Sequence, residues 1–400
     1  MYPRISDFFN DVLGTNFCLP IQSFGFFMAM AFVVAYFILR YEYRRKTALG
    51  IFPTWKSKEE KGGPISINEV FLNAAIYALL GFKLFLMFED YNVFCDNPQD
   101  AILSAEGSWL GAIILGALGG SYKFYQYRKF KDSQPEVLEV EKNLSDELGT
   151  IFTIAFISGV IGAKVFHNLE YIDKFMEDPV GQLLSFSGLT FYGGLLVGTA
   201  AVLYYVYRRG YQLLPFVDGA SMILILGYGI GRIGCQVSGD GDWGINNTSP
   251  KPDWLSWAPD WLWAYDYPHN VLRKGSVMED CAAHWGDYCT QLDVPVFPTP
   301  IYETTMAFII FGILWFTRKR LPFWGQTMSV YLIFNGIERF IIEKIRVNPG
   351  QFAEGAFTQA EIISTGLVLI GLTFLILTTF VWKKNLSNRE IKPLRVKKKK

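Results

Sequence analysis

Long apolar segments alternate with short polar segments along most of this chain. A helix needs about 20 apolar residues to cross a bilayer. The segments that approach or reach this length are residues 22–39, 68–88, 107–123, 149–167, 187–207, 215–237, 300–317, 324–345 and 360–382. The pattern therefore predicts an all-α, polytopic integral membrane protein with about nine transmembrane helices.

Basic clusters predict the orientation of these helices. The clusters follow every second predicted helix, at residues 40–46, 123–131, 208–209, 318–320, 383–384 and 396–400. The loops on the other side, at residues 89–100, 168–179 and 240–298, are acidic or neutral overall. Because Lys and Arg accumulate in cytoplasmic loops, we expect a periplasmic N-terminus and a cytoplasmic C-terminus.

The predicted helices and loops divide the chain into consecutive parts. The longest polar loop outside the cytoplasm is rich in Trp, Tyr and Asp, which suits a small head at the membrane surface. The parts are a first transmembrane helix and cytoplasmic loop (1–67), an extra transmembrane hairpin (68–131), a cytoplasmic connector (132–148), central transmembrane helices (149–239), a periplasmic head loop (240–298), C-terminal transmembrane helices (299–382) and a basic cytoplasmic tail (383–400).

The extra hairpin resembles residues 149–212, which indicates an internal duplication. Glycine, lysine, phenylalanine and glutamate occur at matching positions in residues 79–91 and 160–172. After a one-residue slip, residues 111–120 align with 193–202. In each copy a lysine precedes a glutamate by six positions (Lys83 and Glu89, Lys164 and Glu170). That spacing puts the two on different helix faces, so we expect the lysines to extend to the surface rather than to form ion pairs.

Composition supports the membrane interpretation. The chain has 51% hydrophobic and only 18% charged residues, with a formal net charge of zero, so no nucleic-acid partner is indicated. The five cysteines form no CxxC pair, and no Cys/His spacing predicts a metal site. Cys281 and Cys289 lie in the predicted head loop, where a disulfide between them can form.

The segment 227-GYGIGRIGCQVSGDGDWG-244 is the strongest candidate for chemistry. Arg232 lies near the end of an apolar helix, and a glycine-rich turn with Asp240 and Asp242 follows. A charge at membrane depth costs at least about 2.5–3.5 kcal/mol, so such a residue normally has a partner and a function. The planar guanidinium suits a phosphate, whereas the structural alternative is an ion pair at a helix end.

A second row of charges occurs in 336-GIERFIIEKIRVNPG-350. Arg339, Glu343 and Arg346 share one helix face, and Glu338 lies off that face. Two arginines around a glutamate on a membrane helix favour an interior site over a solvated face.

Two further segments carry weaker signals. In 190-TFYGGLLVG-198, Tyr192 offers a hydroxyl, and Gly193 and Gly194 permit either a close lipid approach or close helix packing. In 297-FPTPIYETT-305, Glu303 lies one turn into a predicted helix, and Tyr302 suits either a site or an interfacial anchor.

These segments resemble, in order, the motifs of the phosphatidylglycerol–prolipoprotein diacylglyceryl transferases. Residues 231–240 are similar to the family's G-R-I-G-N-F-x-N-G-E, 192–194 to its H-G-G, and 297–303 to its H-P-T-Q-L-Y-E. Residues 339–346 match its R-F-x-x-E-x-x-R in full. The resemblance covers roughly residues 20–45 and 150–382.

The resemblance implies an enzyme of the bacterial inner membrane without cofactor or metal. Its partners are phosphatidylglycerol and prolipoprotein signal peptides with a lipobox cysteine, whose thiol receives the diacylglyceryl group. Arg232 and Arg339 then hold the lipid phosphate. The implied catalytic residues are Arg232, Asp240, Asp242, Tyr192, Arg339 and Glu343. The implied substrate-binding residues are Arg232, Gly193, Gly194, Glu303, Tyr302, Arg346, Cys235 and Gly244.

The chain departs from the family pattern at several positions. Tyr192 and Phe297 replace histidines, Phe24 a tyrosine and Cys235 an asparagine, and Asp240 or Asp242 stands for the signature glutamate. A tyrosine with a pKa of about 10 is a poor base at neutral pH, so thiol activation falls to Asp240, Asp242, Glu303 or the arginines.

A non-catalytic lipid-binding paralogue is one alternative to the transferase. A transporter is another, although the repeat is parallel rather than inverted.

Overall fold

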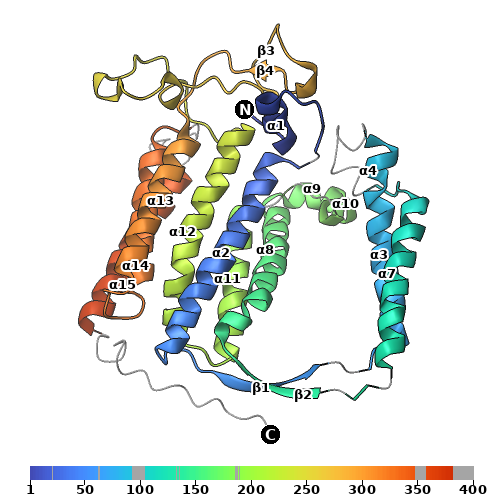
Figure 1. Ribbon diagram of the computed structural model, residues 1–400. Helices are drawn as coiled ribbons and strands as arrows, with labels where there is room; N and C mark the ends of the chain where they lie inside the picture. The colour runs from blue at the N-terminus through green and yellow to red at the C-terminus, as the bar shows by residue number, and fades with distance from the viewer. Residues whose placement is uncertain are drawn as a thin grey trace.

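The computed structural model describes residues 1–19, 21–61, 64–91, 104–131, 133–134, 136–184, 188, 190–346 and 357–381. Most of them are helical, and the long helices run in roughly the same direction, with one pair standing apart from the others (Figure 1). The long helices are α2 (Ser23–Ala48), α3 (Ile67–Leu84), α7 (Trp109–Phe130), α8 (Leu148–Glu170), α11 (Phe191–Arg208), α12 (Leu213–Ser238), α13 (Thr299–Thr317), α14 (Gln326–Glu343) and α15 (Gln359–Ile376).

Shorter elements connect and cover these helices. The short helices are α1 (Ile5–Leu13), α4 (Leu86–Glu89), α9 (Ile172–Glu177) and α10 (Pro179–Leu184). The single turns are η1 (Leu144–Asp146), η2 (Asp253–Leu255), η3 (Asp260–Leu262), η4 (Ala283–Trp285) and the π-helical η5 (Leu377–Val381). The strands are β1 (Trp55–Lys61), β2 (Glu136–Lys142), β3 (Ser276–Val277) and β4 (Thr290–Gln291).

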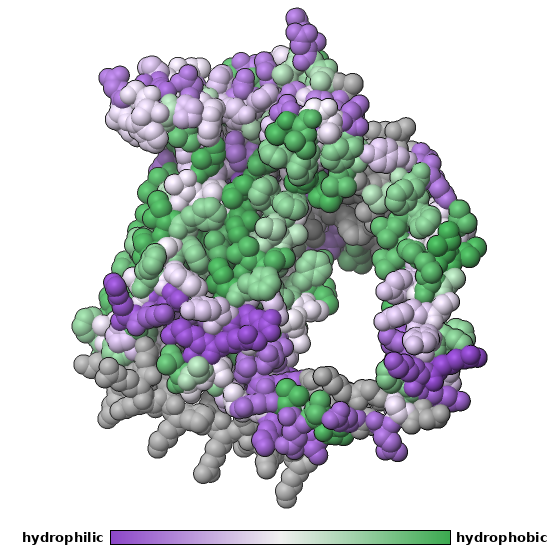
Figure 2. All heavy atoms as spheres, in the orientation of Figure 1, coloured by the Kyte–Doolittle hydropathy of each residue, from purple (hydrophilic) through white to green (hydrophobic). Residues whose placement is uncertain are grey.

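A long helix lies at each predicted transmembrane segment within the described residues. Six helical segments are long and apolar enough to cross a membrane, namely α2, α3 with α4, α8, α12, α13 and α15 with η5. Apolar side chains form a belt around the middle of the molecule, and hydrophilic side chains gather at both ends (Figure 2). The chain is thus a mostly helical membrane protein.

The fold is mostly helical, as predicted, but the described residues also form two short antiparallel ribbons. β1 pairs antiparallel with β2, and β3 pairs antiparallel with β4. In the first ribbon, Lys56 lies opposite Glu141 and Lys58 opposite Glu139, and such opposite charges stabilise cross-strand pairing. The two strands are too far apart in sequence for a local pattern to reveal their pairing. The basic tail, residues 383–400, lies outside the described residues.

The two hairpins make equivalent contacts. A Cβ on Gly81 would lie 2.1 Å from the Gly111 carbonyl oxygen, and one on Gly162 would lie 2.5 Å from that of Gly193. These glycines therefore bring α3 against α7 and α8 against α11 in the same way. The hydroxyl bonds also match, because Ser108 donates to Glu89 and Thr190 donates to Glu170.

The two repeated lysines differ in their surroundings. Lys83 Nζ donates to the carbonyl oxygens of Ser104 (2.6 Å) and Glu106 (2.7 Å) in the connection to α7. Lys164 is only 8% exposed. The expectation that both lysines extend to the surface is therefore wrong for Lys164.

The end of the bundle that carries β1 and β2, called the ribbon end, contains a buried charge cluster. Glu42 on α2 is 1% exposed and accepts hydrogen bonds from Arg45 (2.9 Å) and from Arg318 after α13 (3.2 Å). Lys46, one turn further along α2, donates to the carbonyl oxygen of Pro215 in α12 (2.6 Å). These contacts explain why α2 continues to Ala48, beyond the predicted end at residue 39.

A second buried acid at the ribbon end positions α14. Asp218 on α12 accepts hydrogen bonds from the backbone N–H groups of Gly325 (2.7 Å) and Met328 (2.9 Å). These N–H groups belong to the first turn of α14, which has no intrahelical partners for them. A carboxylate there also interacts favourably with the helix dipole, so Asp218 fixes where α14 begins.

Residues 240–298, called the head below, cover the other end of the bundle, between the end of α12 and the start of α13 (Figure 1). Trp243, Tyr267 and Val296 form its small core. Cys281 and Cys289 form a disulfide.

The N-terminal helix α1, which the sequence analysis did not predict, packs against the head. Arg4 donates to the carbonyl oxygen of His284 (2.8 Å), and the Met1 amino group donates to that of Pro268 (2.9 Å). The start of the chain is therefore held against the head.

The close approach of α8 and α11 predicts that Gly162→Ala is destabilising. The new methyl group would overlap the Gly193 carbonyl, and overpacking of this kind typically costs about 1–3 kcal/mol. Thermal unfolding in detergent measures the effect. Gly149→Ala, on the same helix with no atom within 4 Å of the added Cβ, is the control and should be neutral or stabilising. Equal melting temperatures for both variants would contradict the prediction.

Candidate active site

Glu303 on α13 is the centre of a buried charge cluster. Its side chain has no exposed surface, and its Oε2 lies 2.7 Å from Nε of Arg232 on α12. Its Oε1 lies 3.2 Å from Nη1 of Arg346 and 3.7 Å from Nη1 of Arg339. A buried carboxylate is costly unless it is paired, so Glu303 requires these cations. One acid therefore joins arginines from α12, α14 and the segment after α14.

Asp242, in the turn after α12, is a second carboxylate for the same arginines. One of its oxygens pairs with Arg232, and the other lies 2.6 Å from Nη2 of Arg346. Its backbone oxygen accepts a hydrogen bond from the Thr299 hydroxyl (2.7 Å) at the start of α13. Arg232 and Arg346 thus each connect Glu303 with Asp242.

Arg339 is the most accessible of the three arginines. Its side chain is 27% exposed, compared with 17% for Arg232 and 14% for Arg346. Its Nη2 lies 2.7 Å from Oε2 of Glu343, one turn further along α14. Glu343 therefore holds the guanidinium toward the cluster and leaves its outer edge open to a ligand.

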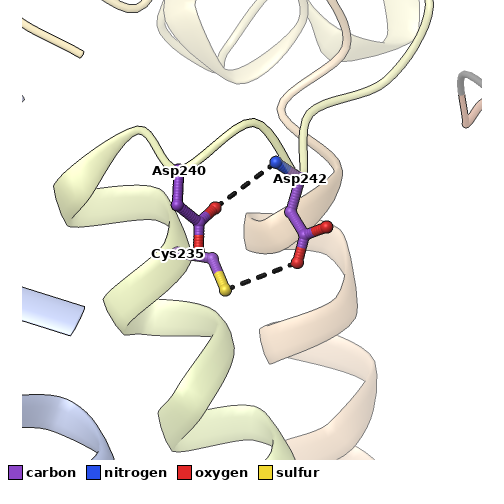
Figure 3. Close-up of side chains that lie close together, drawn as sticks. All are labelled: Cys235, Asp240 and Asp242. Carbon is purple, nitrogen blue, oxygen red and sulfur yellow. Dashed lines mark hydrogen bonds between the residues drawn. The ribbon is translucent and has the colours of Figure 1, made fainter. Parts of the chain in front are cut away.

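Cys235, Asp240 and Asp242 lie together at the end of α12 (Figure 3). The Cys235 Sγ is 3.6 Å from Oδ2 of Asp242, and Asp240 accepts a hydrogen bond from the Asp242 backbone (3.3 Å). Their possible metal-ligating atoms lie within 4.8 Å of one another. Both oxygens of Asp242 are already paired with arginines, however, and these positive charges oppose a bound cation.

Gly244 allows the head to join the end of α14. Its N–H donates to the carbonyl oxygen of Phe297 (2.8 Å), and it forms an isolated antiparallel bridge with Arg346. A Cβ on this glycine would lie 2.4 Å from the carbonyl oxygen of Ile345. The close backbone approach that glycine permits therefore places Arg346 beside Asp242.

The two aspartates of the turn have pKa values shifted in opposite directions. Burial raises the pKa of Asp242, but the charges of Arg232 and Arg346 outweigh burial and bring it below its ordinary value. For Asp240, burial raises the pKa above its ordinary value, and the charge of Asp242 adds to the effect. Asp242 thus remains ionised to lower pH than Asp240.

Three other predicted site residues make structural contacts. Gly193 and Gly194 pack against α8, where added Cβ atoms would lie 2.5 and 3.0 Å from the carbonyl oxygens of Gly162 and Gly159, as in the packing alternative. The Tyr302 hydroxyl donates to the carbonyl oxygen of Leu262 in the head (2.6 Å).

Tyr192 stands at the start of α11 with 39% of its surface exposed. No described contact joins it or the two neighbouring glycines to Arg232.

Two residues next to the cluster were not proposed for the site from the sequence. Tyr228 lies one turn before Arg232 on α12, and its ring centroid is 5.0 Å from the guanidinium. Its hydroxyl donates to Oε1 of Glu338 on α14 (3.2 Å). The i, i+4 spacing of Tyr228 and Arg232 could have indicated from the sequence that Tyr228 belongs to the site. Glu338 lies off the helix face of Arg339, so only its contact with α12 in the structure shows that it borders the cluster.

The cluster has the chemistry of an anion site that orients its arginines in advance. Buried carboxylates fix the guanidinium groups, so their remaining N–H donors do not have to reorganise when a negative group arrives. Planar guanidinium groups bind phosphate oxygens in pairs. The arrangement can therefore bind a phosphoryl group and stabilise negative charge that develops on it.

The low pKa of Asp242 predicts how its contribution to stability depends on pH. Asp242→Asn removes the charge that pairs with Arg232 and Arg346, so the variant should melt at a lower temperature at pH 7. The difference should persist above about pH 4, near the ordinary aspartate pKa, and disappear as the pH falls through the lowered value. Thermal unfolding in detergent across this range measures it. A difference that already closes near about pH 6 would contradict the prediction.

Comparison with known proteins relates this site to a family. A sequence model described as "Prolipoprotein diacylglyceryl transferase" matches residues 123–377. The phosphatidylglycerol–prolipoprotein diacylglyceryl transferase of Leptospira interrogans is 25% identical over 325 residues, which cover 69% of this chain and 90% of the relative. The protein of the same name from Thermus thermophilus is 29% identical over 236 residues, which cover 55% and 79%.

The matched region includes every residue of the charge cluster and begins near the end of α7, so most of the extra hairpin lies outside it. It spans more than half of the chain. The chain therefore belongs to the prolipoprotein diacylglyceryl transferase family.

Proposed function

We propose that the cluster around Glu303 is where this chain transfers the diacylglyceryl group of phosphatidylglycerol to prolipoproteins, the reaction for which its relatives are named. The observation that carries the proposal is the convergence of Arg232, Arg339 and Arg346 on one buried carboxylate. Charges of this kind at membrane depth suit a substrate whose only charged group is a phosphate.

The arginines hold the lipid during the reaction. Arg232 and Arg339 bind the phosphate and stabilise the charge on the departing glycerol phosphate, while Glu343 orients Arg339. Asp242 and Glu303 orient Arg232 and Arg346. The lipobox cysteine of the prolipoprotein approaches from the head side and attacks the carbon of the diacylglyceryl group that is bonded to the phosphate oxygen, which releases glycerol phosphate.

The remaining candidates border this region. Tyr192 is proposed to donate a hydrogen bond to the lipid, and Asp240 and Cys235 line the turn where the peptide meets it. Gly193, Gly194, Gly244 and Tyr302 are proposed to keep the walls of the binding site in place through the contacts described above.

The topology that suits this reaction has nine transmembrane helices with the head and the N-terminus in the periplasm. The basic residues at the ribbon end, including Arg45, Arg208 and Arg318, support a cytoplasmic location for that end. The Cys281–Cys289 disulfide in the head supports an oxidising compartment on the other side. A bacterial inner membrane provides both.

Direct transfer to a peptide tests the proposed function. Purified protein in detergent is mixed with phosphatidylglycerol and a lipobox peptide, and mass spectrometry measures the diacylglyceryl mass gained by the peptide cysteine. A gain that requires both substrates is the expected result. Retained phosphatidylglycerol without transfer would instead favour the non-catalytic lipid-binding alternative.

The phosphate-binding role predicts that Arg339→Ala lowers the transfer rate by about 10²–10³-fold, the usual effect of losing one donor to a developing oxyanion. Expression should change little, because Arg339 is the most accessible arginine of the cluster and Arg232 and Arg346 still pair with Glu303. Arg208→Ala, at the ribbon end of α11, is the control and should keep the full rate. Wild-type turnover by Arg339→Ala would rule out its role in binding the phosphate.

A further inference from the structure

Glu338 borders the charge cluster but forms none of its described ion pairs. Its surface is only 2% exposed. Its Oε1 accepts the hydrogen bond of Tyr228, and its Oε2 is buried without a hydrogen-bond partner among the described residues. An ionised carboxylate in this position is costly, whereas a protonated one is not. The nearby charges of Arg232 and Arg339 favour the ionised form before the step, and the unpaired Oε2 then makes uptake of a proton favourable.

Tyr228 connects this carboxyl group to the site. Its hydroxyl contacts Glu338 and its ring lies against the guanidinium of Arg232, which is paired with Glu303 and Asp242. The row Arg232–Tyr228–Glu338 runs from the phosphate-binding region into the bundle, between α12 and α14.

The charge balance of the cluster also favours proton uptake. Among the described residues, five carboxyl groups (Asp240, Asp242, Glu303, Glu338 and Glu343) gather around three arginines (Arg232, Arg339 and Arg346). The groups that face Glu338 are Tyr228 and Arg232 from α12, Glu303 from α13, and Tyr331 and Arg339 from its own helix. Where acids outnumber cations at short range, one of them binds a proton readily.

We infer that Tyr228 and Glu338 together accept the proton of the substrate thiol, the task left open by Tyr192 and Phe297 at positions where the family has histidine. The inference rests on the transfer reaction proposed above. The thiol S–H bond breaks, its proton passes to the Tyr228 oxygen, and the Tyr228 proton passes to Glu338. The thiolate sulfur then bonds to the diacylglyceryl carbon next to the phosphate. The bond from this carbon to the phosphate oxygen breaks, and its electron pair stays on that oxygen.

This proton transfer offsets the charge of the leaving group. Glycerol phosphate departs with one more negative charge than the phosphodiester carried, while the Glu338 carboxylate becomes neutral. The net charge of the site is therefore unchanged across the step. Glu338 acts through Tyr228, so it is a positioning residue, and Tyr228 is the group that meets the thiol.

Glu338→Gln tests this assignment, because the amide keeps the size and the acceptor for Tyr228 but cannot take the proton. We expect a transfer rate about 10²-fold lower at neutral pH, within the usual contribution of a general base. The loss should shrink as the pH rises toward about 8.5–9, where the thiol ionises unaided. Tyr228→Phe should show the same loss of rate and the same dependence on pH. Glu147→Gln, a buried acid at the ribbon end paired with Arg209, is the control and should keep the wild-type pH profile.

A peptide with selenocysteine in place of the lipobox cysteine gives a second measurement. Its selenol is ionised at neutral pH and needs no base, so it should restore most of the rate of Glu338→Gln. An unchanged rate in Glu338→Gln, or a loss that is equal at every pH and with both peptides, would overturn the inference. These results leave the proposed function intact, since that fails only when the wild-type protein transfers nothing.

Discussion

The burial of Glu303 is the constraint on which the rest of the site depends. A carboxylate without exposed surface inside a membrane bundle is tolerated only with cations around it. Those cations come from α12, α14 and the segment directly after α14, and α12 is far from the other two in sequence. The arginines in turn are tolerable at this depth because Glu303, Asp242 and Glu343 lie beside them. Packing of these helices and assembly of the site are thus one event.

Contacts at both ends of the bundle keep these charges in register. At the ribbon end, Asp218 fixes the first turn of α14 through two backbone hydrogen bonds. At the head end, the backbone contact of Gly244 with Ile345 and Arg346 fixes where the chain leaves α14. A helix fixed at both ends cannot slide or turn, so Arg339 is held at the level of Glu303. In the mechanism proposed here, this rigidity orients the arginines for a phosphate before the lipid binds.

The two similar hairpins share a packing motif but differ at a side chain that we propose to contact the lipid. The glycine contacts and hydroxyl–glutamate bonds that join α8 to α11 recur between α3 and α7. By the same alignment, Leu110 stands where Tyr192 stands in the second copy. The copy outside the matched family region therefore keeps the helix packing but lacks the polar group. We interpret the extra hairpin as structural.

The sequence by itself determined the helical membrane class, the position of each long helix and the three arginines of the site. Apolar runs, basic clusters and the spacing of Arg339, Glu343 and Arg346 are local patterns, and local patterns survive in a single sequence. Only the tertiary structure decided the rest. It placed Glu303 among the arginines, assigned Gly193 and Gly194 to helix packing, paired β1 with β2, and brought Glu338 to Tyr228. Each of these depends on which faces of distant segments meet, and helix spacing alone carries no information about the neighbour across the interface.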